Sequence, residues 1–325
     1  MVAACLVLLA LAVVESIALG TRQIPFGTVL DALTDPVVGN NDHVYVRDTR
    51  VPRTVVGLVA GVALGVAGAL MQGVTRNPIA DPGLLGVNAG AGLAVVVAIW
   101  GLGLTAPTGY LWFAFLGAAV AAVLVHGVAS LGWEGVTPVK LALVGAALTA
   151  VATSLVTLVL LRDQRTLDEF RLWQVGTLLG RPVSLALLLL PFVVVGVLLA
   201  LASTPALNLL ALGDDGARGL GQHLAVGRGL VLASVVLLCG AATALVGPIA
   251  FVGLVVPHVA RFLVGPDYRW LVPLSALLGP ALLLAGDVVG RLVARPAEVE
   301  AGLVVAVVGA PVLVLLVRTS KQVAS

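Results

Sequence analysis

The stretch "TRNPIADPGLLGVNAGAGLAVV", residues 75–96, interrupts sequence that is otherwise strongly apolar. Residues 54–75 before the break and residues 82–133 after it contain no Asp, Glu, Lys or Arg. Between them, the run "RNPIADP" (76–82) has two prolines, and proline breaks a helix. Non-helical backbone at membrane depth is tolerated only where it is buried in protein or faces a water-filled cavity. The stretch therefore predicts a break between two membrane helices, where freed backbone groups can line a path or a gate.

The composition is that of an integral membrane protein. Of the 325 residues, 60% are hydrophobic and 10% are charged, and the mean hydropathy is +1.14. Soluble domains are about 25% charged. The net charge of +2 gives no sign of nucleic-acid binding, and two isolated cysteines make neither a disulfide framework nor a metal site. We therefore expect a multi-pass protein of the cell membrane, with lipid around it.

Ten apolar segments approach the ~20 residues that a helix needs to cross the hydrocarbon core. They are residues 2–20, 54–73, 86–103, 110–131, 141–161, 183–203, 229–247, 248–264, 270–290 and 300–317. The segments are continuously apolar rather than alternating, which favours helices over a β-barrel. The sequence thus predicts an all-α integral membrane protein with ten transmembrane helices, one domain over residues 1–325, and both termini on one side.

The distribution of basic residues does not orient the chain. Of the 18 lysines and arginines, eight fall on the side of the termini and ten on the other side. The positive-inside rule then slightly favours termini outside. The excess is small, and we expect the arginines of the side opposite the termini to have a role other than setting the topology.

Four long stretches together resemble the membrane permeases of type II ABC importers, which take up iron-siderophores, haem and vitamin B12. They are residues 46–92 ("VRDTRVPRTVVG…"), 206–221 ("ALNLLALGDDGARGLG"), 247–273 ("GPIAFVGLVVPHVARF…") and 286–317 ("GDVVGRLVARPAEVE…"). The resemblance implies a fold like that of the vitamin B12 importer permease, with ten helices per subunit. It also implies three kinds of partner: a second permease, identical or homologous; ABC ATPase subunits; and a substrate-binding protein.

The resemblance implies a cytoplasmic gate at the opening stretch. Asn77 and Ile79 fall at its centre, and a second gate element falls at "VTPVK" (136–140), around Pro138 and Val139. The alternative is a simple interfacial cap, in which Asn and Asp side chains cap the next helix while Pro and Gly make a turn.

The chain has no ATP-binding loop. Such a loop requires G-x-x-x-x-G-K-[ST], and neither Lys140 nor Lys321 has that context. ATP and magnesium are therefore expected to bind a separate ATPase subunit. This chain is expected not to be an enzyme and not to bind a cofactor. The resemblance implies a cytoplasmic coupling loop at about 204–224, whose alternative is an ordinary solvated loop. The expected coupling residues are Leu212, Gly213, Asp214, Asp215 and Arg218.

Three arginines match positions whose side chains bind acidic residues of a substrate-binding protein in the family. They are Arg50, Arg53 and Arg291. The planar guanidinium group suits such a role because it binds a carboxylate with two hydrogen bonds. Local ion pairs are the alternative. Arg291 could pair with Asp287 four residues earlier on one helix, and Arg50 could pair with Asp48.

The segment "RDQRTLDEFRLWQVGTLLG" (162–180) corresponds to a short helix over the substrate mouth in the family. Phe170, Arg171 and Trp173 are the expected contacts for a large, polar, anionic cargo. An amphipathic helix lying at the lipid interface, with Trp as its anchor, explains the same residues.

An iron(III)-siderophore is the expected cargo, and haem or cobalamin is the alternative. A different class, an ion-coupled secondary transporter, requires carboxylates near the middle of the membrane. Only Glu15 and Asp287 are loose candidates for such carboxylates, and neither lies at the centre of its segment. Glu15 is expected near the water interface.

Overall fold

The computed structural model describes residues 1–131, 136–220 and 224–323, and within these ranges the chain is helical and has no β-strand. The helices are α1 (Val2–Ala18), α2 (Phe26–Thr34), α3 (Asn41–Tyr45), η1 (Val46–Arg50), α4 (Val51–Thr75), η2 (Pro82–Leu85), α5 (Val87–Leu102), α6 (Pro107–Ala129), α7 (Pro138–Leu160), α8 (Gln164–Gln174), α9 (Val183–Leu210), α10 (Asp214–Gly219), α11 (Leu224–Val246), α12 (Val252–Val264), α13 (Tyr268–Val293) and α14 (Ala301–Val323).

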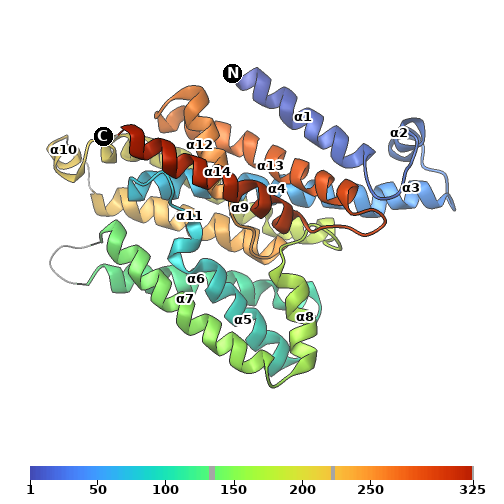
Figure 1. The fold of residues 1–325 in the computed structure, drawn as a ribbon, viewed down its shortest axis with the longest axis horizontal. Coiled ribbons are helices and arrows are strands. Elements are labelled where there is room, and N and C mark those ends of the chain that lie inside the picture. The colour runs from blue at the N-terminus through green and yellow to red at the C-terminus, as the bar shows by residue number, and fades with distance from the viewer. Residues whose placement is uncertain (132–135, 221–223, 324–325) are drawn as a thin grey trace.

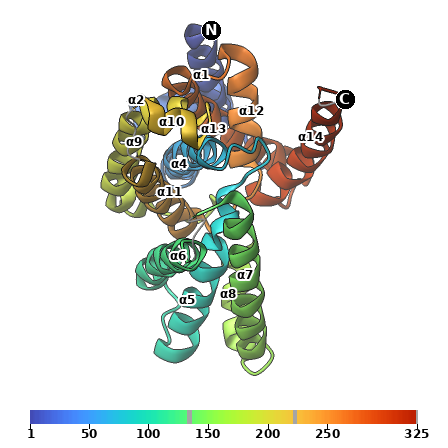
Figure 2. The ribbon, with the colours of Figure 1, turned by 90° about the vertical axis from the view of Figure 1, so that its left-hand side faces the viewer.

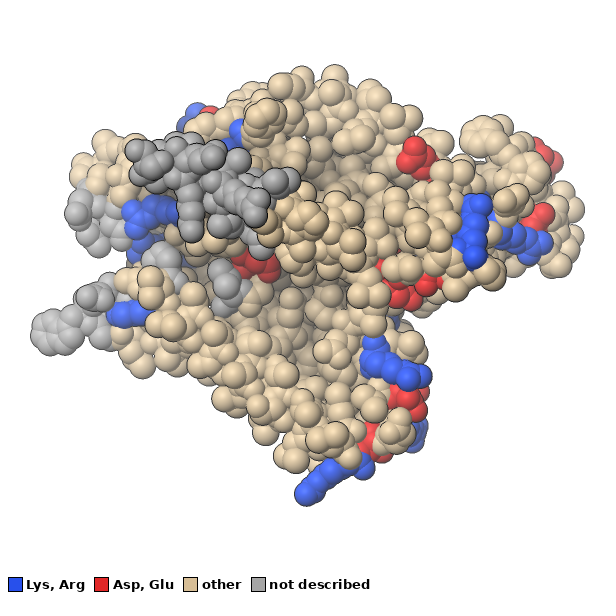
Figure 3. Space-filling view, in the orientation of Figure 1, with Lys and Arg blue, Asp and Glu red and all other residues tan. Residues whose placement is uncertain are grey.

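Each of the ten apolar segments expected from the sequence overlaps one helix, namely α1, α4 to α7, α9 or α11 to α14. Within the described residues, six helical stretches are long and apolar enough to cross a membrane. Four more apolar helices are shorter: Val2–Ala18, Val87–Leu102, Val252–Val264 and Ala301–Val312. Figure 3 shows most of the visible charged side chains toward two ends of the molecule, with a wide uncharged band between them. The protein is thus an all-helical, multi-pass membrane protein, and the exact number of ten spans stays a prediction.

The bundle has two distinct ends (Figure 1). The α10 end carries α10, the end of α4, the beginning of α7 and the C-terminus. The α8 end carries α2, α3, α8 and the loop from α13 to α14. Helix α4 runs from one end to the other and so connects them.

Helix α4 lies in the centre of the bundle, and α7 lies at its edge (Figure 2). In the most apolar window of each span, 78% of the residues are buried for α4 but only 17% for α7. Close packing of α4 depends on glycine. A Cβ atom at Gly61 would lie 2.3 Å from Cα of Pro280 on α13, and one at Gly68 would lie 1.9 Å from the carbonyl oxygen of Gly253 on α12. These contacts bring helix backbones together as small residues do in membrane bundles.

The break predicted at residues 247–248 is also present. Helix α11 ends at Val246, and α12 begins at Val252 after Phe251, whose φ of 69° is unusual for a residue with a side chain. The freed carbonyl group of Val246 accepts a hydrogen bond of 2.9 Å from the backbone N–H of Thr177. The irregular backbone is therefore paired inside the protein, as a membrane interior requires.

Candidate functional site

The opening stretch forms a turn directly after the central helix. Helix α4 ends at Thr75, and Arg76 adopts the left-handed conformation with φ 51°. The backbone N–H of Asn77 then donates to the carbonyl oxygen of Gln72 over 3.2 Å, so the last turn of the helix closes on itself. Ile79 is 42% exposed at the α10 end, whereas the next residue, Ala80, is buried. An apolar side chain is thus presented on a turn fixed by the helix before it.

The polar residues of this turn make local caps. Asn77 Oδ1 accepts from the backbone N–H of Ile79 over 3.1 Å, and Asp81 Oδ1 accepts from the backbone N–H of Gly83 over 2.8 Å. Asp81 is the N-cap residue of η2, in agreement with the capping alternative. A cap and a gate are compatible roles, because the caps fix the turn that presents Ile79. The gate itself stays a prediction.

The second expected gate element, residues 136–140, leads into α7, which packs against η2 of the opening stretch. Thr137 caps α7 by accepting from the backbone N–H of Lys140 over 3.3 Å, and Val139 is 67% exposed. The side chain of Pro138 lies outside the described part of the structure. A small cavity of about 30 Å³ is lined by Met71 and Val74 of α4 and by Val136 and Thr137. The fold therefore brings the two sequence elements together at the α10 end.

The expected coupling loop contains a short helix. Gly213 has φ 93°, which glycine adopts without strain, and α10 (Asp214–Gly219) follows it between α9 and α11 (Figure 1). Leu212 is exposed and Ala217 is buried. The side chains of Asp214, Asp215 and Arg218 lie outside the described residues, so their coupling role stays a prediction.

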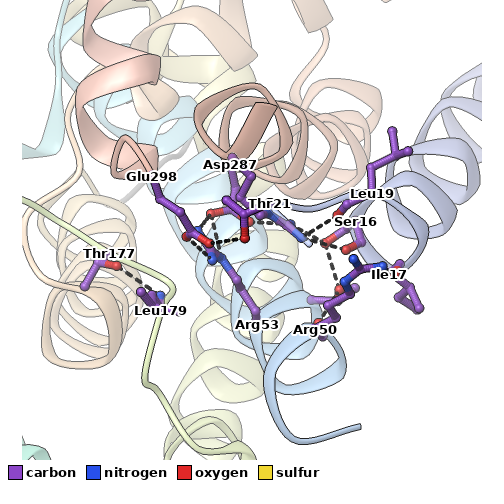
Figure 4. A network of polar contacts seen from close by, with 12 residues as sticks. Ser16, Ile17, Leu19, Thr21, Arg50, Arg53, Thr177, Leu179, Asp287 and Glu298 are labelled. Carbon is purple, nitrogen blue, oxygen red and sulfur yellow. Dashed lines mark hydrogen bonds and ion pairs between the residues drawn. The ribbon is translucent and has the colours of Figure 1, made fainter. Parts of the chain in front are cut away.

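The three arginines expected to dock a binding protein are buried in one polar network, of which Figure 4 labels Arg50 and Arg53 with Asp287 and Glu298. Arg50, Arg53 and Arg291 are 1%, 2% and 1% exposed. Arg53 donates from Nε and Nη2 to Oδ1 of Asp287 over 2.9 and 2.7 Å, and from Nη1 to Oε2 of Glu298 over 2.6 Å. Arg291 Nη2 lies 2.5 Å from the other carboxylate oxygen of Asp287. The local pair between Arg291 and Asp287, one of the alternatives, is therefore present.

Other donors of this network cap the end of α1. Arg50 Nη1 donates to the carbonyl oxygens of Ile17 and Ala18 over 2.9 and 2.7 Å, and Arg291 Nη1 donates to those of Ser16 and Leu19 over 2.8 and 3.0 Å. The last carbonyl groups of a helix have no partner within the helix and carry partial negative charge. Helix α1 has no basic residue in its last turn, so arginines from α4 and α13 provide the compensating charge.

The buried network has a net charge of +1, from three arginines minus the carboxylates of Asp287 and Glu298. The alternative pair between Arg50 and Asp48 is not among the contacts of the described residues, because both Nη groups of Arg50 donate to backbone carbonyl groups instead. In this conformation the three arginines are engaged within the chain. Docking of a binding protein by them stays a prediction.

Sequence reasoning missed Glu298 as a member of this network. It lies 245 residues from Arg53 along the chain, in a loop where no helical spacing points to it. Its only sequence signal is the acidic composition of "PAEVE" (296–300), immediately after a basic helix end.

Helix α8 places its two aromatic residues inward and its arginine outward. Phe170 and Trp173 are buried, with ring centroids 5.6 Å apart, whereas Arg171 is exposed and lies 3.5 Å from Asp168. The helix begins at an N-cap, Asp163, which accepts hydrogen bonds from the backbone N–H and the hydroxyl group of Thr166. The hydroxyl bond, followed by backbone N–H groups, holds the pKa of Asp163 below its ordinary value.

A groove of about 310 Å³ lies between α5, α7 and α8 at the α8 end. Its lining residues are Asn88, Ala89, Gly92, Thr149, Thr153, Val156, Phe170, Trp173, Gln174 and Pro248. The polar members carry amide, hydroxyl and indole groups, and none of the lining residues is charged. Among the described residues, Nε1 of Trp173 has no hydrogen-bond partner. Two of the three expected mouth residues therefore line this groove, and Arg171 does not.

Comparison with known proteins agrees with this architecture. The FecCD transport family matches residues 8–319. The chain is 45% identical over 314 residues to the ferric enterobactin transport system permease protein FepD of Escherichia coli, covering 96% of this chain and 93% of that protein. It is 40% identical over 315 residues to the probable siderophore transport system permease protein YfiZ of Bacillus subtilis, covering 97% and 94%.

A haem-related protein is also similar. The chain is 34% identical over 322 residues to the hemin transport system permease protein HmuU of Yersinia pestis, covering 98% of this chain and 95% of that protein. A solved structure of a metal-chelate type ABC transporter in an inward-facing conformation superposes with a TM-score of 0.84 at 26% identity, covering 97% of this chain and 98% of that chain. Family, sequence and fold agree along nearly the whole length, and the chain belongs to the FecCD transport family.

Proposed function

We propose that this chain is the permease of an ATP-driven importer that carries an iron(III)-siderophore across the cytoplasmic membrane. The observation that carries the proposal is the family match over residues 8–319, together with relatives named for siderophore and ferric enterobactin transport. In this proposal ten helices cross the membrane, the α10 end faces the cytoplasm, and the α8 end receives substrate from a binding protein.

The groove between α5, α7 and α8 is the proposed substrate surface. Its uncharged amide and hydroxyl groups suit a chelate whose metal is already coordinated, because no lining group competes for the iron. A buried donor without a partner costs about 1–3 kcal/mol. Nε1 of Trp173 is buried in this conformation, so in this proposal substrate oxygens accept from it, and recover this free energy, once α8 shifts during passage.

Uptake of iron-loaded chelates into proteoliposomes that contain the complete transporter tests this assignment. Trp173→Phe removes the N–H group but keeps an aromatic ring, so we expect a higher KM for the chelate and little change in protein yield. Trp112→Phe is the matched control, because Trp112 packs against Phe115 and Phe192 outside the groove. An unchanged KM in Trp173→Phe would remove Trp173 from the pathway. Uptake of hemin but of no siderophore would favour haem as cargo, in line with the similarity to HmuU.

The proposed ATPase contact is α10. ATP and magnesium bind the separate ATPase, and α10 transmits its movement to the neighbouring helices α9 and α11. Replacing Asp214 and Asp215 with Lys puts like charge at a helix N-terminus and reverses the surface offered to the partner. We expect weaker assembly with the ATPase, or ATP hydrolysis with little import.

The control for this experiment reverses two exposed carboxylates at the opposite end, one within α2 and one at its C-cap, Asp31→Lys with Asp35→Lys. Normal import with normal substrate-stimulated hydrolysis in the Asp214/Asp215 variant would show that α10 is passive. Such a result would leave the family assignment intact.

A second permease, identical or homologous, is proposed to face the side formed by α7 and α14. Both helices lie at the edge of the bundle in Figure 2, and α7 has the least buried apolar window of the six long spans. Exposed residues on that side include Val139 and Leu143 of α7 and Leu303 and Val307 of α14. Two copies meeting here would place both gate elements near a shared axis.

A further inference from the structure

A separate groove lies between α1, α12 and α13, and has a volume of about 330 Å³. Its lining residues are Leu8, Leu11, Ala12, Glu15, Val255, Val256, Val259, Leu278, Ala281, Leu282 and Ala285. Every lining residue except Glu15 is apolar, so the groove suits an apolar chain.

Glu15 is the one ionisable residue of this groove, and it is exposed. Among the residues that the structure describes, its carboxylate makes no ion pair and no side-chain hydrogen bond. The adjacent residue, Ser16, bonds to Arg291 within the buried network, and both Nη groups of Arg50 donate to backbone carbonyl groups. Within the described ranges, no basic side chain pairs with Glu15.

The position of Glu15 matches the length of an amphiphile. It lies three residues before the end of α1 at the α8 end, a rise of ~4.5 Å at 1.5 Å per residue. From there the groove runs along α1 to Leu8, about 10 Å farther toward the middle of the bilayer. Near the water interface Glu15 is at the level of lipid headgroups, so one amphiphile with a cationic headgroup at this end and an apolar chain along the groove would satisfy both parts of the site.

We propose that this groove binds one acyl chain of a phospholipid whose headgroup carries a primary ammonium group, and that the ammonium group pairs with Glu15. The exposed side of α1 around the site is apolar, with Leu8, Leu11 and Val14 all about half exposed, as expected of a surface in contact with lipid. Figure 2 shows α1 away from α7 and α14, the side proposed for the second permease. The site is independent of the transported substrate.

Lipid binding to the purified full-length protein tests the proposal, with native mass spectrometry as the readout. The probes are phosphatidylethanolamine and phosphatidylglycerol with identical acyl chains. We expect a preference of about tenfold for phosphatidylethanolamine in the wild type, as a charge-assisted contact supports. Glu15→Gln should abolish the preference, and Glu15→Lys should reverse it. Glu169→Gln, the same change on α8 outside the groove, should leave it unchanged.

A second pair of variants tests the acyl chain separately. Val259→Trp fills the groove from its exposed rim and should reduce retention of both lipids, whereas Val194→Trp on α9 should not. The proposal is overturned by a wild type without headgroup preference, by a preference that survives Glu15→Gln, or by retention that survives Val259→Trp. It is also overturned if cross-linking at Glu15 captures a second copy of the chain instead of lipid.

Discussion

The two ends of α4 differ in how they are held, although one helix connects them. At the α8 end, Arg53 donates three hydrogen bonds to two carboxylates and is 2% exposed. At the α10 end, the helix stops at Arg76, and the turn that follows is held by backbone bonds and by local caps from Asn77 and Asp81. The beginning of the helix is fixed by long-range ionic contacts. At the α10 end, Gln72 also bonds over a long range, to the carbonyl oxygen of Leu254 and to Arg261, whereas Asn77 and Asp81 in the turn after the helix bond to near neighbours.

This difference indicates that the turn after α4 moves more readily than the helix itself. Breaking a buried ion pair by removing one partner typically costs 3–5 kcal/mol, whereas a single cap contributes ~1 kcal/mol. A change of conformation will therefore proceed first where the cost is small. The arrangement suits a permease whose gate opens at the α10 end while the α8 end keeps its shape.

The largest expected effect is at the fixed end. Arg53→Ala leaves Asp287 and Glu298 with one fewer cation in a buried site, and we expect a loss of about 3–5 kcal/mol in the free energy of unfolding. Urea or thermal unfolding in detergent measures this loss. Arg171→Ala, which breaks an exposed pair, should cost no more than about 1 kcal/mol. Equal free energies of unfolding for the two variants would show that the buried ion pairs of Arg53 do not fix the α8 end.

An intermediate effect is expected at the α10 end, on transport rather than on stability. Ile79→Asp replaces an exposed apolar side chain at the proposed gate, so the free energy of unfolding should change by no more than about 0.5 kcal/mol. The ratio of ATP hydrolysed to substrate imported should rise several-fold in proteoliposomes, because the closed gate loses an apolar contact. A variant with normal coupling would exclude Ile79 from the gate.

The smallest expected effect concerns the docking of a binding protein. Glu298→Gln removes the carboxylate that occupies Nη1 of Arg53. If the arginines themselves bind acidic groups of the binding protein, we expect docking to strengthen by about threefold, and more at low salt. Surface plasmon resonance or a comparable binding assay measures the change.

Glu300→Gln is the matched control for this experiment. It removes the same charge two residues away, and among the described residues Oε2 of Glu300 has no hydrogen-bond partner. Weaker docking in Glu298→Gln alone would instead mean that the network acts by holding the surface in shape.

Much of the fold could be predicted from the sequence, because a membrane helix can be recognised from the hydrophobicity of its own residues. Ten apolar segments each overlapped a helix, and Pro and Gly marked the breaks after Thr75 and Val246. The capping role of Asp81 also follows from local spacing, since a side chain oxygen two residues away reaches a backbone N–H. These features depend on hydrophobicity and backbone geometry over a few residues.

The surroundings of the candidate site could be predicted only in part. The sequence marked Arg50, Arg53 and Arg291 as unusual, but it could not reveal that they cap α1 or that Glu298 completes their network. It likewise named Phe170 and Trp173 without indicating that both are buried beside a polar groove.

What the sequence by itself determined is the membrane environment, the helical segments, their breaks and the family resemblance. What only the tertiary structure decided is which charges meet: Arg53 of α4 lies against Asp287 of α13 and Glu298 of the following loop, and Glu15 faces a groove of apolar residues from three helices. The reason is physical. Hydrophobic periodicity acts over a few residues, whereas the cost of an unpaired charge in an apolar interior is relieved by any partner that folding brings near, however distant in the chain.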